Sequence, residues 1–67
     1  MKIAYFPETD MLSITLRDQP SLESEEVAPG FVLDFGADGA VVGLEIEHAS
    51  QRVNIESISV SELKILS

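Results

Sequence analysis

Cysteine is absent from this 67-residue chain, which also has no tryptophan and a single histidine. Without cysteine the protein forms no disulfide, and a structural zinc site built from Cys and His ligands is excluded as well. A chain without cysteine fits a reducing compartment, so we expect the protein in the cytoplasm. Its stability must therefore come from packing or from association with another chain.

Long hydrophobic runs are also missing. No apolar stretch approaches the ~20 residues of a membrane-spanning helix. Residues 1–10 reach Pro7 and acidic side chains before the apolar core of a signal peptide could form. We expect neither a membrane segment nor a signal peptide.

Basic residues are few. Four Lys and Arg stand against twelve Asp and Glu, which gives a net charge of −8. The four are scattered along the chain, whereas binding to nucleic acid needs clustered positive charge, so we expect no nucleic-acid partner. The acidity serves solubility, or it complements a basic protein partner, since opposite charges speed association.

The length predicts a single small domain over residues 1–67. Such a domain buries only about 60% of its unfolded surface and usually needs a disulfide, a metal or another subunit for stability. Yet 45% of the residues are hydrophobic. With disulfides excluded, we expect a second copy to cover some of them in a homodimer.

Alternation of apolar and polar residues predicts most of the fold. Strands are expected at 2–6 and 11–16, joined by a turn at 7–10. Residues 23–28 indicate an acidic edge strand or a loop, and we favour the strand. Residues 31–35 and 40–46 are predicted to form a hairpin, whose Gly39 suits the positive φ of a tight turn.

The C-terminal part is less regular. Residues 47–52 indicate one helical turn or an irregular link. Residues 59–62 match a helix-capping box before Leu63 and Ile65, although the preceding residues also alternate like a strand. The predicted fold class is therefore α+β and mostly β, an antiparallel meander of four or five strands with a short C-terminal helix.

A pattern spread over the chain adds a family resemblance. Tyr5 and residues 10–14, 32–34 and 38–50 resemble the domain of unknown function 2283 family, small bacterial and archaeal proteins of about this length. Gly36 stands where many members carry a second acidic residue. The resemblance implies no established activity. Members look like neighbours of small toxin-like proteins in bacterial genomes, which implies an antitoxin role.

The densest acidic set includes Asp34, Asp38 and Glu45. Calcium prefers closely spaced carboxylates in a dedicated loop, and the spacing of Asp34 and Asp38 does not match one, so we assign no metal. Asp38 fits turn chemistry before Gly39. Glu45 faces away from its apolar neighbours and would need a partner such as Arg17 or Arg52 if a dimer buried it.

His48 and Ser50 end this region. A Ser-His-acid arrangement needs side chains that converge from separate elements, which neighbours in sequence do not supply, so no catalytic residue is assigned. Ser50 is expected to cap the local turn. Gly43, inside a strand, marks either a bulge or the close approach of another backbone in a dimer or a partner complex.

These observations predict an interaction protein more readily than an enzyme. We expect no cofactor and an antitoxin-like role with a basic protein partner. The alternative is a small ligand-binding or metal-binding domain, or an enzyme, with an acidic pocket at a subunit interface. The candidate ligand-binding or partner-binding residues are Asp34, Asp38, Gly43, Glu45, His48 and Ser50.

Overall fold

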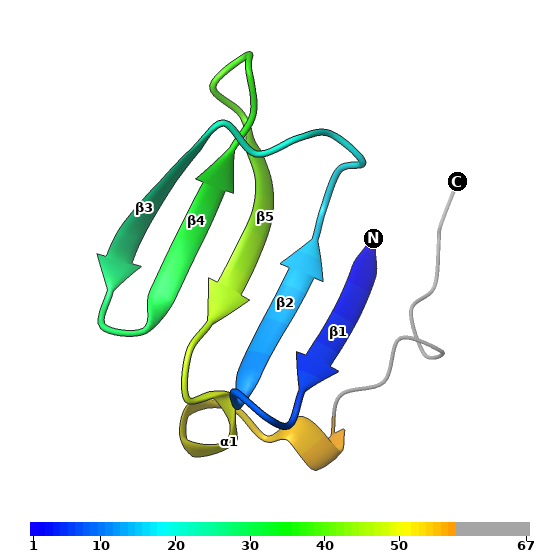
Figure 1. Cartoon of the computed structure of the whole chain (residues 1–67), viewed down its shortest axis with the longest axis vertical. Coiled ribbons are helices and arrows are strands. Elements are labelled where there is room, and N and C mark those ends of the chain that lie inside the picture. The colour runs from blue at the N-terminus through cyan, green and yellow to red at the C-terminus, as the bar shows by residue number, and fades with distance from the viewer. Residues whose placement is uncertain (58–67) are drawn as a thin grey trace.

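The computed structural model describes residues 1–57, which form five strands followed by two short helices (Figure 1). The strands are β1 Lys2–Phe6, β2 Met11–Thr15, β3 Glu23–Ala28, β4 Phe31–Phe35 and β5 Val41–Ile46. The helices are α1 Ala49–Arg52 and the 3-10 helix η1 Ile55–Ser57. The predicted class, α+β and mostly β, is confirmed. The helix predicted from the capping box at 59–62 lies outside the described residues.

All five strands are antiparallel in one sheet, in the order β1-β2-β5-β4-β3. β1 and β2 form one hairpin, and β3, β4 and β5 follow one another as a meander. Residues 16–22 join the two units by crossing the end of the sheet from β2 to its far edge (Figure 1). β5 therefore returns to the centre, and β1 and β3 are the two edges.

The register gathers the apolar side chains on one face. Ile14 pairs with Leu44, which pairs in turn with Leu33. Leu12 pairs with Ile46 in the next apolar row. Because side chains alternate between faces along a strand, the residues between these positions line the opposite, polar face. The polar face carries Ser13, Ser24, Glu26, Val32, Asp34, Gly43 and Glu45.

The core lies at the end of the sheet next to α1. Leu12, Ile46 and Ala49 are buried together, and Val53 and Ile55 pack against them from the segment around η1. Ala49 is fully covered because α1 follows β5 directly and folds back onto the sheet. Val42, farther along β5, is also buried, whereas much of the remaining apolar face is only half-buried, including Ile14, Leu33 and Leu44. Within residues 1–57, no helix is long and apolar enough to cross a membrane.

Candidate functional site

Two groups of polar side chains stand out, one at each side of the sheet. The Asp10 cluster consists of Tyr5, Asp10 and Ser50 and joins the β1–β2 turn to α1. The second group lies on the polar face of β3 to β5, which we call the acidic strands. Of the six sequence-predicted residues, Ser50 belongs to the Asp10 cluster, and Asp34, Gly43 and Glu45 lie on the acidic strands.

Asp10 closes the turn between β1 and β2 in a left-handed conformation, with φ +54°. Its Oδ1 accepts hydrogen bonds from the Tyr5 hydroxyl at 2.6 Å and from the Ser50 backbone N–H at 3.0 Å. Its Oδ2 accepts one from the Ser50 hydroxyl at 2.7 Å. The Asp10 carbonyl also accepts the Ala49 N–H at 2.8 Å. A single residue thus ties the first turn of the chain to the start of α1.

The charge of Asp10 suits this role. Hydrogen bonds from Tyr5 and then Ser50 lower the pKa of the Asp10 carboxyl, because they stabilise its ionised form. The same carboxylate raises the pKa of the Tyr5 hydroxyl, which stays a donor. Both carboxylate oxygens accept hydrogen bonds from the same chain, so the cluster holds the β1–β2 turn against α1.

Ser50 bonds to Asp10 rather than to His48. The prediction that Ser50 caps its own turn was wrong. Ser50 donates both its N–H and its hydroxyl to Asp10, so the carboxylate from the first turn caps the helix. His48 precedes α1 with φ +52°, is exposed and makes no side-chain capping bond.

Asp34 occupies the polar face between β3 and β5. It pairs with Ser24 on one side and Gly43 on the other, and the Ser24 hydroxyl donates to its Oδ1 at 2.6 Å. A Cβ at Gly43 would lie 3.4 Å from Asp34 Oδ2 and 3.2 Å from the Ile14 carbonyl oxygen. Gly43 therefore gives room to the carboxylate and lets the β2 backbone approach.

The bulge interpretation of Gly43 has a counterpart in the sheet, while the approach of a backbone from another chain stays a prediction. The backbone that lies close to Gly43 is that of β2 within the same chain. The strand register between β4 and β5 shifts between Asp34 and Phe35, immediately beside the Asp34–Gly43 pair. The extra residue falls at Val42, which is buried, so the irregularity places an apolar side chain inside.

Glu45 lies next to this group on β5. Hydrogen bonding to the Asp34 carboxyl raises the pKa of Glu45, and partial burial and the negative charges of Asp34 and Glu47 add to the effect. The Glu45 carboxyl is therefore easier to protonate in the folded chain than an isolated one. Arg17 and Arg52, the partners expected for Glu45, are both engaged elsewhere.

Arg17 instead reaches the β4–β5 turn, where its Nη1 lies 3.4 Å from Asp38 Oδ2. Asp38 Oδ1 also accepts the Ala40 N–H at 3.1 Å. This backbone bond, followed by the charge of Arg17, lowers the pKa of Asp38. Gly39 has φ +79°, as predicted for the turn. Asp38 thus performs the expected turn chemistry.

Arg52 covers the other glycine turn. Its Nε donates to the Glu47 carbonyl at 2.9 Å, and its guanidinium lies 5.7 Å from the centre of the Phe31 ring. A Cβ at Gly30 would lie 2.6 Å from Arg52 Nε. Gly30, with φ +80°, therefore admits both the turn and the arginine.

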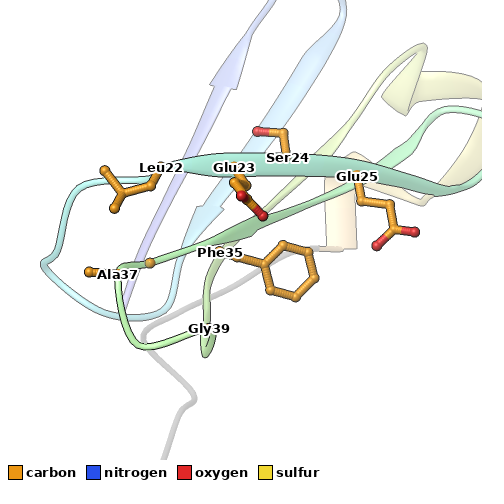
Figure 2. A pocket seen from close by; sticks show the side chains of 8 residues that line it. Leu22, Glu23, Ser24, Glu25, Phe35, Ala37 and Gly39 are labelled. Atoms are coloured by element: carbon orange, nitrogen blue, oxygen red, sulfur yellow. The ribbon is translucent and has the colours of Figure 1, made fainter.

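A shallow hollow of about 380 Å³ lies beside the N-terminal half of β3. Figure 2 shows the Phe35 ring on the same side of the strand as the Glu23 and Glu25 side chains, with Ser24 pointing the other way. The remaining lining comes from Leu22, Gly36, Ala37 and Gly39. Among residues 1–57, no three Asp, Glu or His side chains are grouped so that they could hold a metal ion.

Sequence reasoning missed Tyr5 and Asp10 as site residues. Both belong to the pattern that carries the family resemblance, and Ser50 ends that pattern. The grouping of Phe35 with Glu23 and Glu25 was also missed, because it depends on strand register.

No curated protein and no solved structure matches the chain. A family model with the description "Protein of unknown function (DUF2283)" matches residues 2–50, from the start of β1 to Ser50. The match includes the whole Asp10 cluster and all the acidic strands. Because it covers more than half of the sequence, the chain belongs to this family of proteins of unknown function.

Proposed function

We propose that the protein is a cytoplasmic, non-catalytic interaction protein whose acidic strands bind a basic protein, in the manner of an antitoxin. The distribution of charge carries this proposal. Carboxylates gather on three neighbouring strands, β3, β4 and β5, at positions Glu23, Glu25, Glu26, Asp34 and Glu45. A surface of this kind attracts a positively charged partner and speeds its association.

The positive charges nearest to these strands are already engaged. Arg17 pairs with Asp38 in the β4–β5 turn. Arg52 donates to the Glu47 carbonyl and lies over Phe31. The raised pKa of Glu45 reflects the same crowding of negative charge. A basic partner would relieve this repulsion, which supports binding at the acidic strands.

The Asp10 cluster supports an architectural role at the other end of the sheet. Its carboxylate is occupied by Tyr5 and Ser50, and His48 is exposed beside it. An acid that accepts hydrogen bonds from its own chain stabilises the fold. This leaves the acidic strands as the surface for binding.

Co-expression with the product of the adjacent gene tests the proposal. We expect a complex that co-purifies, weakens with added salt and restores growth if the partner is toxic. Reversal of charge on β3 by Glu25→Lys with Glu26→Lys should abolish the complex. Reversal at Glu8, an exposed acid in the β1–β2 turn, is the control. Neither a complex nor growth rescue would contradict the proposal.

The Asp34–Glu45 pair favours a second candidate function. A carboxyl group with a raised pKa beside a second carboxylate is a common feature of ligand sites and active sites, so a small ligand-binding, metal-binding or catalytic role at a subunit interface is the alternative. A thermal-shift screen with divalent cations tests its metal version, since a ligand that binds only the folded state raises the melting temperature. A flat screen counts against it.

Self-association is also proposed. Ile14, Leu33 and Leu44 form a row across the apolar face and are only half-buried. A second copy would cover this row with its own, leaving both polar faces, which carry Glu26, Asp34 and Glu45, outside for basic partners. Sedimentation equilibrium should give a dimer, and a monomer at all concentrations would contradict the idea.

A further inference from the structure

We propose that β3 is the docking edge, and that an extended, arginine-bearing segment of the basic partner pairs with it as an additional strand. This inference rests on the proposed function and deepens it by naming the surface and the form of the partner. It depends on an open sheet edge, on the charge along that edge, and on a hollow beside it.

The edge is open over most of its length. Within residues 1–57, β3 pairs only with β4, so its other side presents backbone N–H and C=O groups that have no strand partner. The Glu23 carbonyl accepts the Ser21 hydroxyl at 3.4 Å, and the strand is irregular between Glu26 and Ala28. All six residues of Glu23–Ala28 are exposed, and the strand spans about 20 Å. At the opposite edge, the inner residues of β1 are half-buried and Tyr5 is bonded into the Asp10 cluster. β3 is therefore the better template for strand addition.

Charge selects the occupant of this edge. Pairing of β3 with β3 of a second copy would place glutamates opposite glutamates in most registers, which is unfavourable. A strand that carries arginine or lysine would instead be attracted to the glutamates of β3. The glutamates that protect the edge against self-association thus favour a basic segment.

Both faces of a docked strand would meet carboxylates. Glu23 pairs with Phe35 and Glu25 with Leu33, so these two glutamates lie on the apolar face. Ser24 pairs with Asp34 on the polar face, where Glu26 also lies. A segment with arginines at alternate positions therefore finds carboxylates whether its arginines lie on the apolar face or on the polar face of the sheet.

The hollow beside β3 favours arginine over lysine. In Figure 2 the side chains of Glu23 and Glu25 flank the Phe35 ring. A guanidinium stacks on an aromatic face and bonds carboxylates through its planar fork, whereas an ammonium lacks that geometry. The chain already shows such a contact, with Arg52 over Phe31 at 5.7 Å. We assign the hollow to one arginine of the partner segment.

Three capped synthetic peptides test strand addition. The first alternates arginine and threonine over seven residues, the second has the same sequence with alternate amides N-methylated, and the third has lysine for arginine. Calorimetry should show binding of the first, with about tenfold or greater loss for the N-methylated peptide and a smaller loss for the lysine peptide. Amide hydrogen exchange should slow along Glu23–Ala28.

Matched variants locate the site. Glu23→Gln with Glu25→Gln should weaken the arginine peptide about tenfold. Glu8→Gln with Glu56→Gln removes the same charge from exposed positions outside the acidic strands and should leave affinity nearly unchanged. Equal losses in the two double variants would show that only net charge matters and would overturn the inference.

The outcomes separate this inference from the proposed function. Equal binding of the parent and N-methylated peptides would overturn strand addition and leave a charge-driven interaction protein. Binding of the adjacent gene product without protection of β3 would have the same meaning. If neither the peptides nor the gene product binds, the proposed function fails together with the inference.

Discussion

At the α1 end of the sheet, one carboxylate accepts three hydrogen bonds from Tyr5 and Ser50. At the β3 edge, three glutamates lie on a strand whose residues are all exposed. In the first region, the acid lies beside hydrogen-bond donors of the same chain. In the second region, several acids lie where the described residues provide little positive charge.

This difference separates two uses of the same chemical group. The pKa of Asp10 is lowered because hydrogen bonds from Tyr5 and Ser50 stabilise its charge, whereas the pKa of Glu45, on β5, is raised by hydrogen bonding to Asp34, by partial burial and by neighbouring negative charge. Folding therefore favours the ionised form of Asp10 and penalises the ionised form of Glu45.

Truncation in the core should separate the two regions most strongly. Leu12 is 2% exposed and belongs to the core cluster, whereas Val27 on β3 is 53% exposed. Leu12→Ala should lower the free energy of unfolding by about 2–5 kcal/mol, and Val27→Ala should change it by less than about 0.5 kcal/mol. Urea denaturation measures both. Similar losses would mean that β3 is covered in the free protein.

The two glycines with positive φ provide a matched pair. Alanine at either position adopts a left-handed conformation at a cost of about 1–2 kcal/mol. At Gly30 the new Cβ would also displace Arg52, while nothing lies within 4 Å of one at Gly39. Gly30→Ala should therefore lower the free energy of unfolding more than Gly39→Ala. Equal effects would show that Arg52 moves aside without loss.

The Asp10 cluster should respond to acid. Because its pKa is lowered in the folded state, Asp10 contributes stability that is present above the ordinary Asp pKa of about 4 and is lost as pH falls through the lowered value. Asp10→Asn should thus have a lower free energy of unfolding than the parent at neutral pH, and the difference between the two should shrink toward pH of about 2. Asp18→Asn, an exposed acid outside the cluster, is the control. A difference in stability that does not change with pH would contradict the structural role of the Asp10 carboxylate.

At Glu45 the pH dependence of stability should have the opposite sign, and the effect should be the smallest of the four. Its pKa is raised in the folded state, so the folded chain holds the proton more tightly and stability falls as pH rises from the ordinary Glu value of about 4.3 through the raised value. Glu45→Gln should be more stable than the parent at pH near 7, with no advantage below pH of about 4. Thermal melts at both pH values measure it. Lower stability of the variant at neutral pH would refute the account.

Much of the fold was predictable from local patterns. Alternation located the strands, and Gly39 marked the turn with positive φ. The central position of β5 was not predictable, because alternation shows which face a residue occupies but not which strand lies beside it. The proximity of Asp34 to Glu45 depends on the β4–β5 register, and that of Phe35 to Glu23 depends on the β3–β4 register. The Asp10 cluster joins residues 40 positions apart, so no local pattern contains it.

The connection at residues 16–22 has a kinetic consequence. It sends the chain to the far edge before β5 returns, so among residues 1–57 β5 is the only strand that bridges the β1–β2 hairpin and the β3–β4 hairpin. During synthesis both hairpins emerge before β5, and neither can complete its pairing until β5 inserts between them. Such long-range closure slows folding. We expect assembly of the sheet to be late and cooperative, with insertion of β5 as its committing step.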